Sequence, residues 1–240
     1  MFEEYYNNFY KELAKIDDQN NTFDKIANIL PPLKGDEKII DIGCGHGSVS
    51  HELIKKGFEV TGIEINEEAL ESLKKKGFRI IKKDITMPLN INEKFDIIFI
   101  LDVLEHMFDP FVLLKEAKET AKENGYIIIS VPLYFDLLDR IKILFTGNII
   151  SLDNLCYGIE NYKKFKTFNY DHIRFFRPKE VLEMGKNLNL RIEQIEYLPS
   201  FYLGRNYILK LIMKLLSNKI TAPLVPNLLA HSMKVRWKVV

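Results

Sequence analysis

The sequence contains little cysteine and lacks any long uncharged apolar run. Its two cysteines, Cys44 and Cys156, cannot build a disulfide framework across 240 residues, so a reducing, cytoplasmic setting is the simplest interpretation. No uncharged apolar run approaches the ~20 residues that a bilayer-spanning helix needs. The first residues, MFEEYYNNFYKEL, are acidic and aromatic, unlike a secretory signal peptide. We therefore expect a cytoplasmic protein that is soluble or peripheral to a membrane.

Acidic residues are missing from the C-terminal region. Residues 199–240 contain seven Lys or Arg and no Asp or Glu, and the whole chain carries +1, so the first 198 residues carry 1 − 7 = −6. A general nucleic-acid binder is more often basic throughout or along one face, which argues against nucleic acid as a partner. With 47% hydrophobic residues the chain can bury the core of one large α/β domain, which excludes a disordered or fibrous protein.

The most informative stretch is residues 38–50, KIIDIGCGHGSVS. Residues 38–42 form a β-branched run typical of a buried strand, and glycines at positions 43, 45 and 47 permit a turn with positive φ and close approach to a ligand. We expect a helix to begin at Ser48, with its free N–H groups facing the turn. Asp41 stands two residues before the first glycine, where a carboxylate suits a cation better than a phosphate. A tight turn without a ligand is the alternative.

Strands and helices alternate after this turn. We predict strands at 59–65, 79–82, 95–101 and 126–131, with helices at 66–76 and from Pro110 to residue 122, the latter stopped by Gly125. Such alternation predicts a parallel, doubly wound sheet whose ligands bind at the carboxyl ends of the strands. Four acids fall at that edge: Asp41, Glu64, Asp84 and Asp102. Glu64 stands where doubly wound folds place an acid on ribose hydroxyls, although an exposed acid at a strand end and a turn-forming Asp84 are the plainer alternatives.

The stretch from Asp41 to Gly47 resembles the first motif, D-x-G-x-G-x-G, of the class I S-adenosylmethionine (SAM) dependent methyltransferases. The run LDVLEHMFDP from Leu101 is similar to the fourth-strand motif of a subgroup with the ubiquinone-biosynthesis O-methyltransferases and related small-molecule and sugar methyltransferases. The resemblance covers residues 38–131 and recurs near His172. It implies SAM as cofactor and methyl transfer, with O-methylation expected. A nucleotide-cofactor oxidoreductase and a non-catalytic SAM-binding subunit are the alternatives.

The resemblance also implies a set of site residues. Asp41 helps to order the amino group of SAM, the glycine turn passes under its methionine part, and Asp84 binds the adenine beside Ile85. The cofactor-binding set is Asp41, Gly43, Cys44, Gly45, Gly47, Glu64, Ile65, Asp84, Ile85, Leu101 and Asp102. His106 and His172 are the candidate catalytic bases, because neutral imidazole accepts a proton near neutral pH. A structural hydrogen-bonding role is the alternative for each.

A metal site is a further alternative. The run D-x-x-E-H from Asp102 resembles the E-x-x-E-H run by which some ubiquinone O-methyltransferases and small-RNA 2′-O-methyltransferases hold a divalent ion. Glu105, His106 and His172 would complete the ligand set. Because Asp102 replaces the first Glu of that run and has a shorter reach, we assign no metal ligand.

The remaining segments complete one methyltransferase domain over residues 1–240. We expect a helical cap at 1–33, an acceptor-side insertion at 133–170, an amphipathic helix at 203–217 and strands at 190–198 and 232–239. The predicted fold is a Rossmann-like, doubly wound, seven-stranded α/β sheet, mostly parallel with an antiparallel last strand and helices on both faces. The apolar insertion and basic tail favour a lipid-linked acceptor with peripheral membrane contact, against a soluble small-molecule acceptor.

Overall fold

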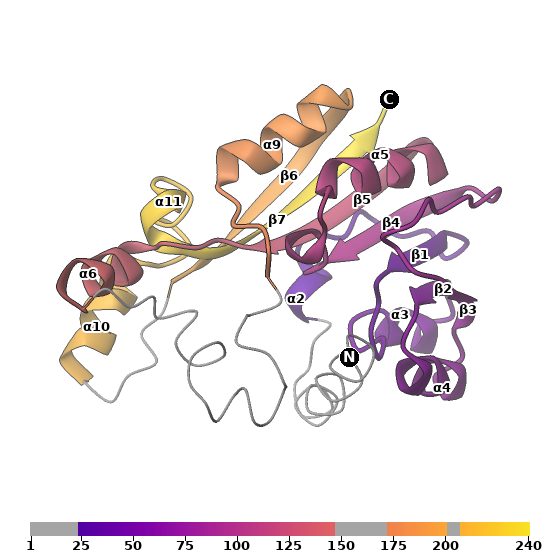
Figure 1. Cartoon of the computed structure of the whole chain (residues 1–240), viewed down its shortest axis with the longest axis horizontal. Coiled ribbons are helices and arrows are strands. Elements are labelled where there is room, and N and C mark those ends of the chain that lie inside the picture. The colour runs from indigo at the N-terminus through magenta and orange to yellow at the C-terminus, as the bar shows by residue number, and fades with distance from the viewer. Residues whose placement is uncertain (1–23, 147–171, 201–206) are drawn as a thin grey trace.

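A seven-stranded sheet organises the protein, in the order β3-β2-β1-β4-β5-β7-β6 (Figure 1). The computed structural model describes residues 24–146, 172–200 and 207–240. The strands are β1 (Lys38–Ile42), β2 (Glu59–Glu64), β3 (Arg79–Lys82), β4 (Phe95–Leu101), β5 (Ala121–Pro132), β6 (Leu190–Pro199) and β7 (Ala230–Val239). Strands β1 to β5 pair in parallel, and β7 lies antiparallel between β5 and β6. The predicted fold class, with its antiparallel last strand, is confirmed.

Helices cover both faces of the sheet. They are α2 (Asp24–Ala27), α3 (His51–Lys55), α4 (Glu67–Lys75), η1 (Leu104–His106), α5 (Pro110–Thr120), α6 (Leu137–Thr146), α9 (Pro178–Asn187), α10 (Tyr207–Leu216) and α11 (Pro226–Leu229). In Figure 1, α5 and α9 lie above the sheet, whereas α2, α3 and α4 lie below it. The predicted cap and insertion fall mostly outside the described residues.

The core is split between the two faces because the central strands are apolar on both sides. Along β1, Ile39 packs with the lower cluster and Ile40 with the upper one. Neighbouring β4 repeats this alternation, with Ile97 and Phe99 below and Ile98 above. Successive side chains of a strand point to opposite faces of the sheet. Because both faces are buried here, the strands have continuous apolar sequences rather than alternating apolar and polar residues.

Two predicted helix boundaries were wrong. Helix α3 begins at His51, three residues after Ser48, because residues 48–50 form a turn behind Gly47. Helix α5 ends at Thr120, and the chain enters β5 directly at Ala121. Gly125 therefore lies within β5, where a Cβ would come within 3.0 Å of the Asp96 carbonyl oxygen. Glycine is required there by close backbone contact rather than by the end of a helix.

Helix α10 and strand β7 lie where the sequence predicts them. The described part of the amphipathic helix spans Tyr207–Leu216, and the last strand starts two residues earlier than predicted, at Ala230. Within the described residues, no helix combines the length and the apolar character that crossing a membrane requires.

Candidate SAM and acceptor site

The glycine turn after β1 adopts the backbone conformation that the sequence predicts. Gly43, Gly45 and Gly47 have φ values of 71°, 53° and 72°, a region that residues with a Cβ rarely adopt. A Cβ on Gly43 would lie 2.9 Å from Val103, and one on Gly47 would lie 2.6 Å from both Leu73 and Phe78. All three glycines are therefore favoured by conformation, and Gly43 and Gly47 are also required by packing.

The side chain of Cys44 fills a gap beneath the turn. A Cβ on Gly62 of β2 would lie 2.8 Å from the Cys44 sulfur, so the two positions are complementary in size. Burial raises the pKa of the Cys44 thiol well above its ordinary value. Cys44 therefore acts as a small packing residue, and only its backbone belongs to the turn.

Glu64 ends β2 and connects that strand to the glycine turn. Its Oε2 accepts a hydrogen bond from the Gly45 N–H at 3.0 Å, and its Oε1 accepts from the N–H groups of Ile65 (2.7 Å) and Asn66 (2.9 Å). The carboxylate is buried, whereas the neighbouring Ile65 is half exposed. Glu64 thus has the position predicted for a ribose ligand and also fixes the turn.

Asp41 is buried at the end of β1, behind the turn. The Ser50 hydroxyl donates a hydrogen bond to Asp41 Oδ2 instead of capping α3. The pKa of Asp41 is raised to about 7, mainly by burial and to a smaller extent by the nearby Glu64 carboxylate, against the opposing effect of the Ser50 hydrogen bond. Ser50 was not predicted from the sequence, because its role depends on the orientation of its side chain.

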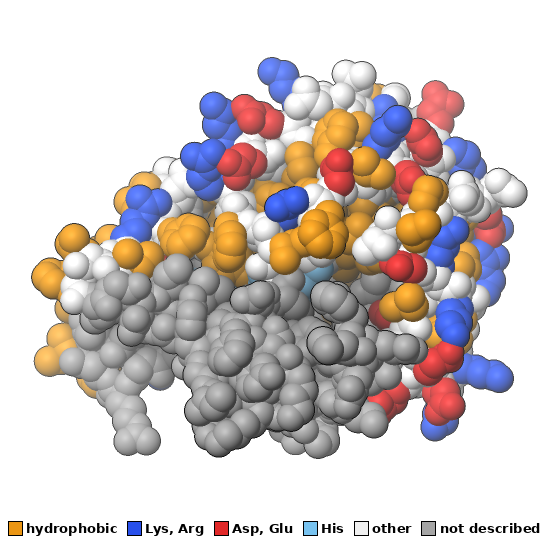
Figure 2. All heavy atoms as spheres, in the orientation of Figure 1, with side chains coloured by type: hydrophobic (Ala, Val, Ile, Leu, Met, Phe, Trp, Pro, Cys, Tyr) orange, Lys and Arg blue, Asp and Glu red, His pale blue; other side chains and the backbone are white. Residues whose placement is uncertain are grey.

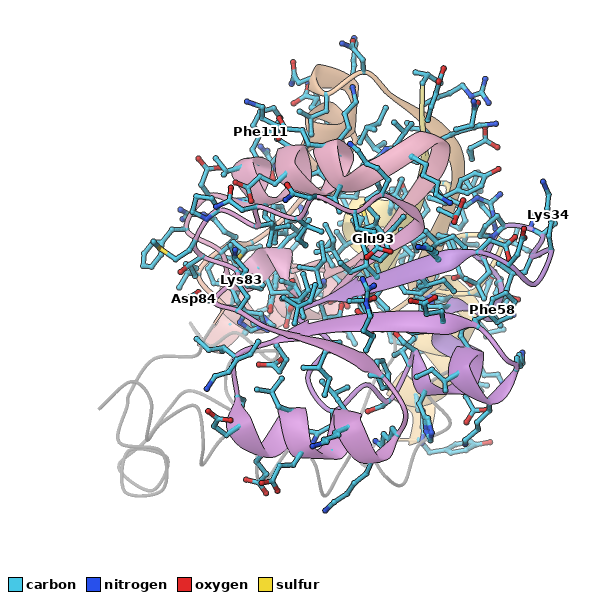
Figure 3. The ribbon with its side chains drawn as sticks, turned by 90° about the vertical axis from the view of Figure 1, so that its right-hand side faces the viewer. Lys34, Phe58, Lys83, Asp84, Glu93 and Phe111 are labelled. Carbon is cyan, nitrogen blue, oxygen red and sulfur yellow. The ribbon has the colours of Figure 1, made fainter. Side chains whose placement is uncertain are left out.

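Asp84 and Ile85 follow β3 at the same edge. In Figure 3, Asp84 lies opposite Lys34 and Phe58, which precede β1 and β2, so it stands at the carboxyl ends of the strands. Asp84 Oδ1 accepts hydrogen bonds from the Thr86 N–H (2.8 Å) and hydroxyl (2.6 Å), which makes it the turn-forming residue that the plainer alternative describes. Ile85 packs toward Gly43.

Asp102 links the ends of β4 and β5. It has a φ of 53°, and its Oδ1 accepts a hydrogen bond from the Ser130 hydroxyl at 2.8 Å. Leu101, the last residue of β4, pairs with Ser130 in the sheet. The structure therefore gathers the predicted cofactor residues at the carboxyl ends of β1 to β4, as the doubly wound pattern requires.

A cluster of two imidazoles and one carboxylate follows β4. The rings of His106 and His172 meet edge to face with centroids 4.6 Å apart, and His172 Nε2 lies 3.9 Å from Glu105 Oε1. The other nitrogen of His172, Nδ1, is hydrogen-bonded to the Tyr134 hydroxyl. The two predicted catalytic residues, separated by 66 positions in the sequence, are thus brought into contact.

The chain around His172 is fastened to η1. The Glu105 carbonyl oxygen accepts hydrogen bonds from the N–H groups of Ile173 (2.9 Å) and Arg174 (3.0 Å). Burial, and secondarily the His106 ring, lower the pKa of His172 to about 3. His172 is therefore neutral across the physiological range.

Comparison with known proteins identifies the family of the chain. A family model described as a methyltransferase domain matches residues 12–195. The chain belongs to this methyltransferase family. It is a class I SAM-dependent methyltransferase with SAM as cosubstrate, so the recognition, the enzyme class and the cofactor predicted from the sequence are confirmed.

Relatives of the methyltransferase agree with this assignment. The ubiquinone biosynthesis O-methyltransferase of Actinobacillus pleuropneumoniae serotype 7 (strain AP76) is 27% identical over 210 residues, covering 78% of this chain and 84% of that protein. The protein of the same description from Pelagibacter ubique (strain HTCC1062) is 27% identical over 177 residues, covering 72% and 68%. A solved SAM-dependent methyltransferase from Archaeoglobus fulgidus has the same fold, with a TM-score of 0.59 at 20% identity, covering 90% of this chain and 92% of that one.

The donor atoms of the methyltransferase's histidine cluster suit a divalent cation. Glu105, His106 and His172 each offer one ligand atom, and these atoms lie within 4.8 Å of one another. Donors around an ion bound at ~2.1 Å lie at most ~4.2 Å apart, so a small contraction completes three bonds. Asp102, the first residue of the motif, does not belong to this group among the described residues, because its carboxylate faces Ser130.

A groove in the described part of the methyltransferase lies elsewhere. It is about 710 Å³ in volume and is lined by residues of α9 and β6, including Leu182 and Ile192. None of the predicted site residues lines it. This groove therefore lies outside the candidate site.

Proposed function

We propose that the methyltransferase transfers the methyl group of SAM to an oxygen atom of a small-molecule acceptor. The observation that carries this proposal is the meeting of His106 and His172 beside Glu105, immediately after the strand that ends at Asp102. In the reaction the acceptor oxygen forms a bond to the methyl carbon, the carbon–sulfur bond breaks, and its electron pair returns to sulfur. The acceptor's proton must then leave, which requires a base at the reacting oxygen.

The cofactor residues have distinct proposed roles. Glu64 accepts hydrogen bonds from the ribose hydroxyls, Asp41 balances the positive amino group, and Asp84 binds the adenine amino group. The turn with Gly43, Cys44, Gly45 and Gly47 passes under the methionine part, while Ile65, Ile85, Leu101 and Asp102 complete the walls. Their positions at the carboxyl ends of adjacent parallel strands support these roles.

The two histidines divide the acceptor chemistry. We propose that His106 takes the acceptor's proton, while His172, neutral because of its low pKa, orients the acceptor. A divalent ion held by Glu105, His106 and His172 would bind the acceptor oxygen and lower its pKa.

The acceptor is proposed to be lipid-linked, presented to a cytoplasmic enzyme that contacts a membrane peripherally. Large apolar side chains stand exposed beside the histidine cluster: Phe108 follows η1, and Ile173 and Phe175 follow His172. Arg174 donates to the Phe108 carbonyl oxygen, which joins the two segments. The relatives described as ubiquinone biosynthesis O-methyltransferases support an acceptor with an apolar part.

Methyl-labelled SAM tests this function. The enzyme is incubated with the lipid and the polar fraction of a cell extract, and the label is followed into each. We expect label in the lipid fraction and a loss of about 10²- to 10⁴-fold in rate for His106→Ala, at unchanged SAM affinity. His51→Ala, a histidine on α3 outside the cluster, is the matched control. Label in the polar fraction alone would contradict the lipid-linked acceptor, and full activity of His106→Ala would contradict its role as base.

Chelation separates the two ways of activating the acceptor. EDTA treatment followed by Mg²⁺, Mn²⁺ or Zn²⁺ should abolish and restore activity if Glu105, His106 and His172 hold an ion. Calorimetric titration of Mn²⁺ into the wild type and into Glu105→Gln provides a readout that does not depend on activity. Unchanged activity in EDTA would assign proton removal to His106 alone.

A further inference from the structure

Helix α10 presents its apolar side chains to the solvent. Tyr207, Ile208 and Leu215 are between 68% and 76% exposed, whereas Met213 is the one buried side chain described in this helix. A helix that packs on its own sheet would bury a continuous apolar stripe instead. Packing of this helix on its own sheet, as an ordinary part of the core, does not fit its exposure.

Two neighbouring segments extend the exposed surface. The Arg140 guanidinium of α6 donates to the Asn227 carbonyl oxygen at 3.3 Å, and the Ser217 hydroxyl donates to the Leu229 carbonyl oxygen at 2.5 Å, so α6 and the end of α10 both meet α11. We call this surface the apolar end, which is the left-hand end of Figure 2. It comprises the exposed residues Ile141, Leu144, Phe145, Tyr207, Ile208, Leu211, Ile212, Leu215, Leu216, Ile220, Leu224 and Val225.

The charges of the apolar end are basic. Arg140, Lys210, Lys214 and Lys219 are all exposed, and the sequence has no Asp or Glu after residue 196. The nearest acid within α6, Asp139, is buried. Exposed apolar side chains interspersed with lysines are typical of helices that lie in the headgroup region of a bilayer.

We propose that the apolar end docks on the surface of an anionic lipid bilayer. The apolar side chains would enter the boundary between headgroups and acyl chains, while the lysines contact lipid phosphates. A second copy of the chain fits less well, because a two-fold contact would bury Lys210, Lys214 and Lys219 of both copies in one interface, and interface cores are depleted of lysine. The inference deepens the proposed function and rests on it in one respect: the bilayer is where a lipid-linked acceptor resides.

The apolar end adjoins the histidine cluster along the chain. Tyr134, which is hydrogen-bonded to His172, precedes the first residue of α6 by three positions. Docking through α6 would therefore place the bilayer surface next to the end of β5, at the edge of the sheet that carries the catalytic candidates. An acceptor anchored in the bilayer could reach the site without leaving the membrane completely.

Vesicle flotation tests the docking in the absence of SAM and acceptor. The full chain is mixed with vesicles of equal parts phosphatidylglycerol and phosphatidylcholine, or of phosphatidylcholine alone, at low and high salt. We expect binding to the anionic vesicles at low salt and a large loss at high salt, because salt screens the lysines. Absence of binding to anionic vesicles at low salt would overturn the proposal, as would a salt-insensitive dimer that hides α10.

Paired variants locate the docking surface. Lys210→Glu with Lys214→Glu should weaken binding at least about 30-fold, the factor for ~2 kcal/mol lost with two basic residues. Lys74→Glu with Lys75→Glu makes the same change in charge on α4, at the other end of the sheet in Figure 1, and should retain most of the binding. Ile212→Glu should abolish binding, whereas Ile192→Glu on β6 should not, although the two isoleucines are 42% and 44% exposed. Equal losses within each pair would overturn the assignment.

Failure of docking and failure of the proposed chemistry give different results. His106→Ala should bind anionic vesicles like the wild type while losing methyl transfer. The Lys210→Glu, Lys214→Glu protein should keep SAM affinity and methylate a detergent-dispersed lipid fraction like the wild type. Loss of SAM affinity in that variant would show that α10 supports the fold, and would overturn its role as a free docking surface.

Discussion

Glu64 Oε2 lies 3.0 Å from the backbone nitrogen of Gly45, and this hydrogen bond joins the end of β2 to the glycine turn after β1. The same carboxylate is the proposed ribose ligand, so it has a structural role before SAM binds. In Glu64→Gln the amide oxygen can still accept from Ile65 and Asn66, but the amide nitrogen cannot accept from Gly45.

We expect Glu64→Ala to weaken SAM binding by roughly 1.5–3 kcal/mol, the scale of a hydrogen bond to a charged group, with Glu64→Gln intermediate. Titration calorimetry measures the affinity, and thermal unfolding without SAM reports the loss of the turn contact separately. SAM affinity equal to that of the wild type in Glu64→Ala would contradict the proposal that SAM binds at the carboxyl ends of β1 to β4.

Gly47 and Gly57 offer a comparison of backbone strain with steric overlap. Both have positive φ, but a Cβ on Gly47 would overlap Leu73 and Phe78, whereas a Cβ on Gly57 would meet nothing within 4 Å. Gly57→Ala should therefore cost only the conformational penalty, roughly 1–2 kcal/mol. Gly47→Ala should cost clearly more and should also weaken SAM binding. Urea denaturation of both variants checks this order, and equal destabilisation would show that Leu73 and Phe78 can move aside.

The sequence predicted the parts of the fold that depend on local apolar pattern. The bounds of β1, β3 and β4 match the prediction, because each is a short apolar run that is bounded by polar residues or glycine. The end of α5 could not be predicted from the apolar pattern. Residues 121–123, Ala-Lys-Glu, are good helix formers, and the pairing of Ala121 with Phe95 across the sheet shows that they belong to β5.

The site was predicted where a motif names its residues and missed where a contact defines them. Asp41 was predicted from the glycine motif, but its partner Ser50 stands nine positions later in no recognisable pattern. Tyr134 is separated from His172 by 38 positions and fell inside a segment interpreted only as an insertion. Such partners depend on the packing of distant segments, which a single sequence does not specify.

The raised pKa of Asp41 predicts that SAM affinity depends on pH. Because burial brings this pKa to about 7, the free enzyme holds Asp41 protonated below that pH. The positive amino group of SAM favours the ionised form, so binding releases a proton there. Affinity should rise with pH through about 7 and then level off. Calorimetry in two buffers of different ionisation enthalpy measures the released proton, and Asp41→Asn should lack both effects.

The raised pKa of Asp41 also determines how the stability of the fold changes with pH. The folded state binds a proton at Asp41 that the unfolded state, with its pKa of 3.8, has already lost. Ionising the buried Asp41 costs free energy in the folded state. The free energy of unfolding therefore falls as the pH rises from about 4 to about 7. Thermal melts of the wild type and Asp41→Asn across this range should converge toward the acid end. A difference that grows as the pH falls would contradict the shift.

Tyr134 is predicted to position His172. For His172 to present a lone pair on Nε2 toward the acceptor or an ion, its hydrogen must reside on Nδ1, and the Tyr134 oxygen is placed to accept it. Tyr134→Phe removes this acceptor with little change in volume. We expect kcat to fall roughly 3- to 10-fold, as for one neutral hydrogen bond of ~0.5–1.5 kcal/mol, with unchanged SAM affinity.

A double-mutant comparison distinguishes positioning from a general loss of stability. If Tyr134 acts through His172, Tyr134→Phe should have no further effect on kcat in a His172→Ala background, because the group that it orients is gone. Tyr197→Phe, a partly buried tyrosine on β6, is the control for loss of a hydroxyl elsewhere. Additive effects of Tyr134→Phe and His172→Ala would show that Tyr134 acts independently of the imidazole, and would contradict its role in positioning His172.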